Sequence, residues 1–354
     1  MIEHYILLGL AGLSFLFSVD KNRLKLKGLI WLSTILFFLY AYILVVFRDT
    51  GIGNDTNAYV DFFYLANQFD SINEFFDYSR FEKGYVLLNY LISRITEDYT
   101  LYFIIFYLIY FICTIRFFRE FSFNKTSWIL PWFLLNIYYS SFNVMRAAMA
   151  LAFVYLFVGY FLKGKRIKAI ISYIVAFSMH VTAIPMGIVF VLKNKYIRKI
   201  LSHEMIFIIG FGIIGAFFSQ LLNLLPDYYA NYANSDYASG SARIANIADF
   251  ILVASLYFLS KKNNLGNWDL APQFRILFMC TVGMSFLGIV FPGSIRIEEF
   301  FKPFALIYVL NTFQYQSNFR RIGIVFVFIG IAMYQIIAFI IRPEWLNIFP
   351  YSFR

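Results

Sequence analysis

Long apolar runs separated by short charged clusters are the feature that most constrains this chain. The sequence is 61% hydrophobic and only 14% charged, whereas a soluble domain is about 45–50% apolar and about 25% charged. The apolar runs are about 15–22 residues long, the length that a helix needs to cross a hydrocarbon core about 30 Å thick. We therefore predict an all-α polytopic membrane protein of about ten transmembrane helices, forming a single integral-membrane domain over residues 1–354. The predicted runs are Tyr5–Val19, Gly28–Phe47, Tyr99–Ile115, Ser127–Phe142, Ala147–Leu162, Met205–Leu225, Asn246–Ser260, Ala271–Phe291, Ile297–Asn311 and Ile322–Ile341.

The net charge of +10 comes from basic clusters that recur between these runs. Short loops rich in Lys and Arg are typical of the cytoplasmic side of a membrane protein. This distribution predicts a topology and argues against nucleic acid as a partner. The clusters lie within residues 21–27, 116–125, 163–168, 193–199, 261–262 and 320–321.

The segment Ile167–Leu192 admits two topologies. As one span it would place the basic residues 193–199 outside and reverse every later loop. As a two-helix hairpin that turns near His180, it keeps all the basic clusters on one side, so the hairpin is the preferred interpretation. Counting its two arms as spans raises the total to about 12 helices, and both termini then lie outside.

This topology places two long loops on the outer face. The first, residues 48–98, contains Phe81–Thr96, which is apolar at helical spacing and is predicted to be an interfacial helix. The second, residues 226–245, is rich in Tyr and Asn and is predicted to form either an interfacial aromatic belt or a platform for sugars. Most of the unusual polar residues also fall on this face, and ionisable groups beside hydrocarbon usually mark a functional site.

Several short motifs in these segments, taken in order, resemble those of the EpsG/Wzy-type polysaccharide polymerases that make O-antigen, capsule and exopolysaccharide. Ala147 stands where glutamine is usual in that family, and Phe300 and Phe301 stand where tyrosine is common. The resemblance covers about residues 40–310. The motifs are Arg48–Thr56 with Tyr59, Glu82–Tyr85 with Asn89, Asn143–Arg146 followed by Ala147 and Ala148, Phe177–His180, and Arg296 with Phe300 and Phe301.

The resemblance implies a fold like that of the C-type membrane glycosyltransferases, and an activity. Such an enzyme joins oligosaccharide units carried on undecaprenyl diphosphate at the outer face of a bacterial inner membrane and releases the lipid diphosphate. It needs no nucleotide sugar, cofactor or metal ion. The implied partners are the lipid-linked donor and acceptor, membrane lipids, a flippase and a chain-length regulator.

Residue roles follow from this chemistry. Arginine binds phosphate bidentately and stays charged, so Arg48, Arg146 and Arg296 are candidates to bind the diphosphate. Histidine titrates near neutral pH, so His180 is the candidate base for the attacking sugar hydroxyl. The rival bases are Glu82, Asp55 and Glu299, and the further candidates for substrate binding are Asp49, Tyr59, Arg243 and again Glu299.

Structural interpretations of the same residues stay open. His180 can be a packed, hydrogen-bonded residue, and Arg146 can extend to lipid headgroups. The residues around Asp55 can form a turn that Gly51 and Gly53 allow.

Two other functions also remain open. The main alternative is a flippase or transporter of the lipid-linked oligosaccharide, although the sequence shows no internal repeat and its polar residues concentrate toward one face. An acyltransferase would need a better-defined His–carboxylate relay. The chain has no phosphate-binding loop, dinucleotide fingerprint, metal-ligand cluster or serine elbow, and Cys113 and Cys280 lie in apolar runs.

Overall fold

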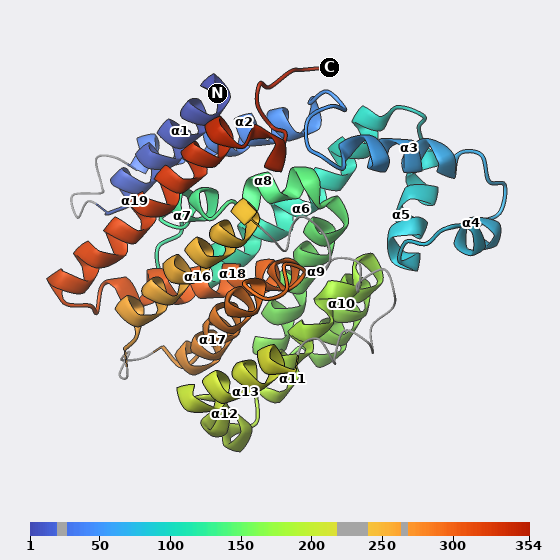
Figure 1. Cartoon of the computed structure of the whole chain (residues 1–354). Helices are drawn as coiled ribbons and strands as arrows, with labels where there is room; N and C mark the ends of the chain where they lie inside the picture. The colour runs from blue at the N-terminus through green and yellow to red at the C-terminus, as the bar shows by residue number, and fades with distance from the viewer. Residues whose placement is uncertain (20–26, 218–239, 263–267) are drawn as a thin grey trace. The chain divides into compact units, whose positions relative to one another are not determined.

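The regular structure of the chain is helical. The computed structural model describes residues 1–19, 27–217, 240–262 and 268–354. In these ranges the elements are helices, together with one isolated antiparallel bridge between Arg48 and Phe353. The predicted all-α class is thus confirmed for the described residues (Figure 1). They form two compact units: unit 1 comprises Met1–Ile184 and Ala332–Arg354, and unit 2 comprises Pro185–Ile331.

Unit 1 holds the N-terminal helices and the end of the chain. Figure 1 shows α3, α4 and α5 grouped beside one another, and α5 packs against both α3 and α4. The helices of unit 1 are α1 (Ile2–Val19), α2 (Lys27–Val46), α3 (Thr56–Ala66), α4 (Ile72–Tyr78), α5 (Lys83–Ser93), α6 (Tyr99–Phe121), α7 (Ile129–Leu134), α8 (Ile137–Asn143), α9 (Met145–Leu162), α10 (Arg166–Met179) and the short 3₁₀ helix η3 (Pro343–Trp345).

Unit 2 contains a second set of helices, and two elements cross the boundary between the units. The 3₁₀ helix η1 (Val181–Gly187) begins in unit 1, and α19 (Asn318–Ile341) begins in unit 2 and ends in unit 1. The helices of unit 2 are α11 (Ile188–Val191), α12 (Lys195–Leu201), α13 (Glu204–Ala216), α16 (Gly240–Ser260), α17 (Ala271–Gly288) and α18 (Ser294–Phe313).

Four helices of the described chain are long and apolar enough to cross a membrane. A fifth candidate is the pair α12 and α13, which is bent by 70° between the two helices. Three further apolar helices are shorter than a full span. The chain is therefore a membrane protein with several spans, and the ten spans predicted from the runs remain a prediction. The four helices are Gly28–Val46, Tyr99–Phe121, Met145–Leu162 and Asn318–Ile341.

The long helices of unit 1 give it two chemically different ends. The Tyr42 hydroxyl in α2 donates to the Ile104 carbonyl oxygen at 2.8 Å, near the start of α6. Near the end of α6, the guanidinium of Arg119 lies 5.2 Å from the Trp31 ring near the start of α2, so these two helices are antiparallel. At that same end Lys163, just after α9, forms a 2.6 Å ion pair with Glu120. The basic residues after α6 and α9 therefore share one end of unit 1, which we call the basic end.

One predicted span is broken. The apolar run Ser127–Phe142 forms two short helices, α7 and α8, so the prediction of one continuous helix there is wrong. Asn136 between them has φ 63°, a left-handed conformation that asparagine tolerates better than most residues. Its side-chain oxygen accepts a hydrogen bond from Gln335 Nε2 in α19 at 3.1 Å.

The helix also breaks at His180, where the sequence predicted a turn. α10 ends at Met179, and His180 is extended, with φ −158° and ψ 126°. The Tyr173 hydroxyl then donates to the Ile184 carbonyl oxygen at 2.6 Å. In a continuous helix these two residues would lie about 16 Å apart along the axis. The chain therefore reverses after His180.

The long segment 48–98 is folded rather than extended. It forms α3, α4 and α5, and α5 (Lys83–Ser93) matches the predicted helix within Phe81–Thr96. Gly53 has φ 89°, and a Cβ there would lie 3.0 Å from the Phe142 carbonyl oxygen, so this turn needs glycine. Its backbone N–H also donates to the Asn347 carbonyl oxygen at 2.8 Å. The C-terminal segment thus holds the 48–56 turn against the end of α8. Of the second predicted loop, residues 226–239 lie outside the described residues, and α16 begins at Gly240.

Candidate active site around Glu82

The carboxylate of Glu82 joins three segments of unit 1. Its Oε2 accepts a 2.5 Å bond from Arg146 Nη1. Its Oε1 lies 2.9 Å from His180 Nδ1 and accepts a 3.0 Å hydrogen bond from the Val181 backbone N–H. The side chains of Glu82, Arg146 and His180 are 19%, 16% and 8% exposed. The structure therefore brings three of the predicted site residues into one largely buried cluster, which we call the Glu82 cluster.

The close approach of α5 to the end of α10 depends on Gly84. A Cβ at this position would lie 2.7 Å from the Ser178 carbonyl oxygen and would also overlap the Ser178 side chain. Glu82 is the N-cap of α5, but its side chain does not cap its own helix. Because glycine lets the two helices approach, that side chain reaches across to His180 instead. The short motif Glu82–Tyr85 thus encodes both the carboxylate and the contact that positions it.

Arg146 lies in the first turn of α9, where the helix dipole disfavours a positive charge. The ion pair with Glu82 offsets this, and the Arg146 guanidinium also lies 4.3 Å from the centre of the Phe81 ring. Its Nε is buried and has no hydrogen-bond partner among the described residues. A buried donor without a partner is costly, typically about 1–3 kcal/mol. Arg146 therefore keeps hydrogen-bonding capacity that an anionic ligand could use.

Two residues at the N-terminal end of α3 extend the cluster. Tyr59 is buried, is a further hydrogen-bonding partner of Arg146, and lies with its ring centre 6.0 Å from that of Tyr85. Asp55 is the N-cap of α3, is partly exposed and makes no capping hydrogen bond with its side chain. Residues four apart on a helix share a face, so Asp55 lies on the same side of α3 as Tyr59. This places a carboxylate one turn from the arginine's tyrosine partner.

The surroundings of Glu82 fix its charge. Burial by itself would raise the pKa of Glu82, but the hydrogen bond with His180 and the charge of Arg146 outweigh it and lower the pKa from 4.5 to about 2. Glu82 is then ionised at neutral pH, and a carboxylate of such low pKa is a weak proton acceptor. This favours His180 over Glu82 as the base. A carboxylate facing Nδ1 favours the tautomer with its proton on Nδ1 and its lone pair on Nε2.

Arg48 lies in a different environment from the one predicted. It is completely buried, and its guanidinium is 4.5 Å from the Phe103 ring and 4.8 Å from the Phe142 ring. Its Nη1 donates to the Val45 carbonyl oxygen at 2.7 Å and to the Tyr107 hydroxyl at 3.0 Å. These contacts use Arg48 to join α2, α6 and α8. We interpret it as a structural residue and do not propose it as a substrate ligand.

The other predicted substrate residues lie apart from this cluster in the chain. Asp49 Oδ1 accepts the Gly51 N–H at 2.8 Å, as in an Asx turn. Arg296 and Glu299 lie in α18, and Arg243 lies in α16, so all three belong to unit 2. The Arg243 side chain is outside the described part of the structure. The roles assigned to these residues remain predictions, and the Glu82 cluster is built from unit 1 alone.

Sequence reasoning missed several polar contacts. The Asn143 side-chain oxygen accepts the Asn54 N–H at 2.5 Å, which joins the 48–56 turn to the end of α8. In unit 2, Glu204 accepts hydrogen bonds from the side chains of Lys261 and Arg275, at 2.7 and 2.8 Å. The position of Arg275 within an apolar run is the sequence feature that could have indicated the contacts of Glu204. Within the described ranges, no group of three or more His, Cys, Asp or Glu side chains could hold a metal ion.

The chain was also compared with known proteins. No curated protein and no solved structure matches it. A family model, that of the EpsG family, matches residues 30–353, which is nearly the whole chain and includes every member of the Glu82 cluster. This family is polysaccharide polymerase-like. With its apolar helices and this match, the chain belongs to the EpsG family.

Proposed function

We propose that this protein is a membrane glycosyltransferase that joins oligosaccharide units carried on a polyprenyl diphosphate, with undecaprenyl diphosphate as the carrier. The observation that carries the proposal is the contact of one ionised glutamate with both His180 and Arg146. A base for a sugar hydroxyl and a cation for a diphosphate are the two groups that this transfer needs. The polymerase-like character of the family supports the same reaction.

In the proposed step, a hydroxyl oxygen of the acceptor unit attacks the anomeric carbon of the donor chain. The bond from that carbon to the diphosphate oxygen breaks, and its electron pair leaves with the diphosphate. The hydroxyl proton passes to His180 Nε2. Glu82 orients the imidazole through Nδ1 and stabilises the imidazolium that forms, the role that a buried carboxylate plays beside other catalytic histidines.

Arg146 is proposed to stabilise the departing diphosphate. A guanidinium carries five N–H donors, and Glu82 engages only Nη1. Tyr59 is a further partner, and the donors that remain, Nε among them, can bind phosphate oxygens while the ion pair with Glu82 holds the group in place. Asp55, on the same side of α3 as Tyr59, is proposed to bind sugar hydroxyls of the acceptor.

The Glu82 cluster is proposed to face the outside of the cell. In unit 1 it lies at the start of α9, opposite the basic end, and basic ends are retained in the cytoplasm. Cysteine substitution tests this orientation at the exposed positions Asp61 and Lys195. In intact spheroplasts an impermeant thiol reagent should label Asp61→Cys, whereas Lys195→Cys should react only after lysis. Labelling of Lys195→Cys in intact spheroplasts would contradict the proposed topology.

Deletion of the gene tests the function itself. A polymerase mutant should carry single capped repeat units on its surface and no polymer. Loss of surface units, or their accumulation inside the cell, would instead indicate a flippase. Complementation of the deletion strain with a gene that encodes His180→Gln should not restore polymer formation. The exposed His203 in unit 2 provides the matched control, and a gene that encodes His203→Gln should restore polymer formation.

A further inference from the structure

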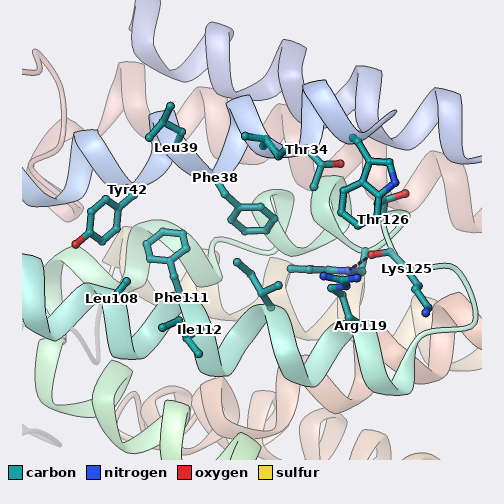
Figure 2. Close-up of a pocket in the computed structure, with 14 residues that line it drawn as sticks. Thr34, Phe38, Leu39, Tyr42, Leu108, Phe111, Ile112, Arg119, Lys125 and Thr126 are labelled. Carbon is teal, nitrogen blue, oxygen red and sulfur yellow. Dashed lines mark hydrogen bonds between the residues drawn. The ribbon is translucent and has the colours of Figure 1, made fainter. Parts of the chain in front are cut away.

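An apolar groove runs along unit 1 between α2 and α6. Its volume is about 400 Å³, and apolar side chains make up most of its wall. Figure 2 shows Phe38, Leu39 and Tyr42 on one wall and Leu108, Phe111 and Ile112 on the other. Ile35, Leu39 and Ile112 are more than half exposed, and both helices are long and apolar enough to span a membrane. The groove therefore opens on a surface that faces hydrocarbon.

The groove is about as long as one leaflet is deep. Its lining follows α2 from Trp31 to Tyr42 and α6 from Leu108 to Arg119. At 1.5 Å per residue each stretch is about 16 Å long, and half of a hydrocarbon core about 30 Å thick is about 15 Å. A single acyl chain of a membrane lipid extends over this depth. A polyprenyl chain is much longer than the groove, so only part of such a chain could lie in it.

One end of the groove is cationic. Arg119 and Lys125 lie together there, and Tyr42 and Leu108 lie at the other end (Figure 2). In the described parts of the chain, neither Arg119 nor Lys125 forms an ion pair with an acidic side chain, and the neighbouring Glu120 is paired with Lys163. The Arg119 guanidinium lies 5.2 Å from the ring of Trp31, a residue type enriched at the membrane interface. The groove thus combines an acyl-length apolar channel with two cations at the depth of the lipid headgroups.

From this combination we infer that the groove is a binding site for an anionic glycerophospholipid, with one acyl chain between α2 and α6 and the phosphate against Arg119 and Lys125. Charge complementarity selects an anionic over a zwitterionic headgroup, since each cation near an anionic membrane surface contributes favourably. The site is at the basic end of unit 1, away from the Glu82 cluster, and is independent of the proposed transferase reaction. Its lipid would come from the leaflet that faces the basic loops.

Native mass spectrometry of the purified full-length protein tests this inference. The protein is titrated in detergent with phosphatidylglycerol or with phosphatidylcholine of the same acyl chains. The wild type should retain one phosphatidylglycerol at concentrations where phosphatidylcholine is not retained. Arg119→Gln with Lys125→Gln should weaken that binding by roughly 30-fold, from about 1 kcal/mol for each cation. Arg116→Gln is the matched control, because Arg116 lies about one turn before Arg119 in α6 but does not line the groove. This variant should bind phosphatidylglycerol like the wild type.

A second variant tests the acyl channel without changing charge. Ile112 lies on the groove wall and is 56% exposed, so Ile112→Trp fills the channel without overpacking a core. It should also weaken phosphatidylglycerol binding. Equal retention of both lipids by the wild type, unchanged binding in either groove variant, or retention of undecaprenyl phosphate in preference to phosphatidylglycerol would each overturn the inference.

Discussion

Replacing Glu82 by glutamine removes the negative charge of the Glu82 cluster while preserving the size of the side chain. We expect polymer formation to fall by about 10²–10⁴-fold, because His180 loses the carboxylate that orients it and stabilises its protonated form. Arg146 loses its ion-pair partner in the same change. The assay is the rate of polymer formation by purified protein from a lipid-linked repeat unit. Glu74→Gln, at an exposed position of α4, is the matched control and should keep normal activity.

The pKa of Glu82 sets the pH range in which this charge matters. A pKa of about 2 in place of 4.5 corresponds to about 3 kcal/mol in favour of the ionised carboxylate in the folded state. Because the folded-state pKa is lowered, this stabilisation is fully present above pH 4.5 and is lost as the pH falls toward 2. The wild type should therefore melt at a higher temperature than Glu82→Gln at pH 7. The difference should shrink only below about pH 4.5, in thermal melts followed in detergent.

A double variant decides whether Glu82 and His180 act together. If glutamate works through the histidine, Glu82→Gln combined with His180→Gln should be about as inactive as the worse single variant. Losses that add in free energy would mean that the two residues act independently. Near-normal polymer from Glu82→Gln would refute the mechanism for this cluster.

Three further substitutions test the site and its scaffold. Gly84→Ala should force α5 away from α10 and lower polymer formation. Gly9→Ala is the control, because a Cβ at Gly9 meets nothing within 4 Å, and it should not lower polymer formation. Equal effects of the two variants on activity would refute the argument that Gly84 allows the close approach. Arg146→Lys should lose most activity despite keeping its charge, because lysine cannot bind phosphate bidentately, whereas Arg80→Lys at an exposed position should be neutral in the same assay. Asn136→Ala and Asn136→Gly both lose the hydrogen bond from Gln335, but only alanine meets the cost of the left-handed backbone, so the alanine variant should be about 1 kcal/mol less stable than the glycine variant; equal melting temperatures of the two variants would contradict this.

The sequence predicts the polar residues of the site better than their contacts. Arg146, His180 and Glu82 stand out because they are ionisable groups beside apolar runs. Their pairing joins positions 64 and 98 residues apart in the chain, and no periodicity predicts a contact over such distances. The role of Gly84 follows from the approach of α10, which its own segment does not reveal.

Arg48 shows the limit of the same reasoning. An arginine that follows an apolar run looks alike in sequence whether it faces a polar cavity or a ring of aromatic side chains. Here the aromatic residues come from α6 and α8, so only tertiary packing distinguishes the two cases. The break at Asn136 was missed for a related reason, because one asparagine in an apolar run is a weak signal and its bond to Gln335 comes from the last long helix.

Reconstitution of polymerisation in detergent tests the central claim most directly. Detergent micelles do not separate two aqueous compartments. A flippase therefore gives no measurable product in detergent, whereas a polymerase can use its lipid-linked substrate without a flippase. Purified protein supplied only with the lipid-linked repeat unit should produce a ladder of longer glycans and release the lipid diphosphate. His180→Gln should produce no ladder, and His203→Gln should match the wild type. Wild-type protein that is folded and binds the repeat unit but never extends it, or His180→Gln protein that extends it normally, would contradict the account.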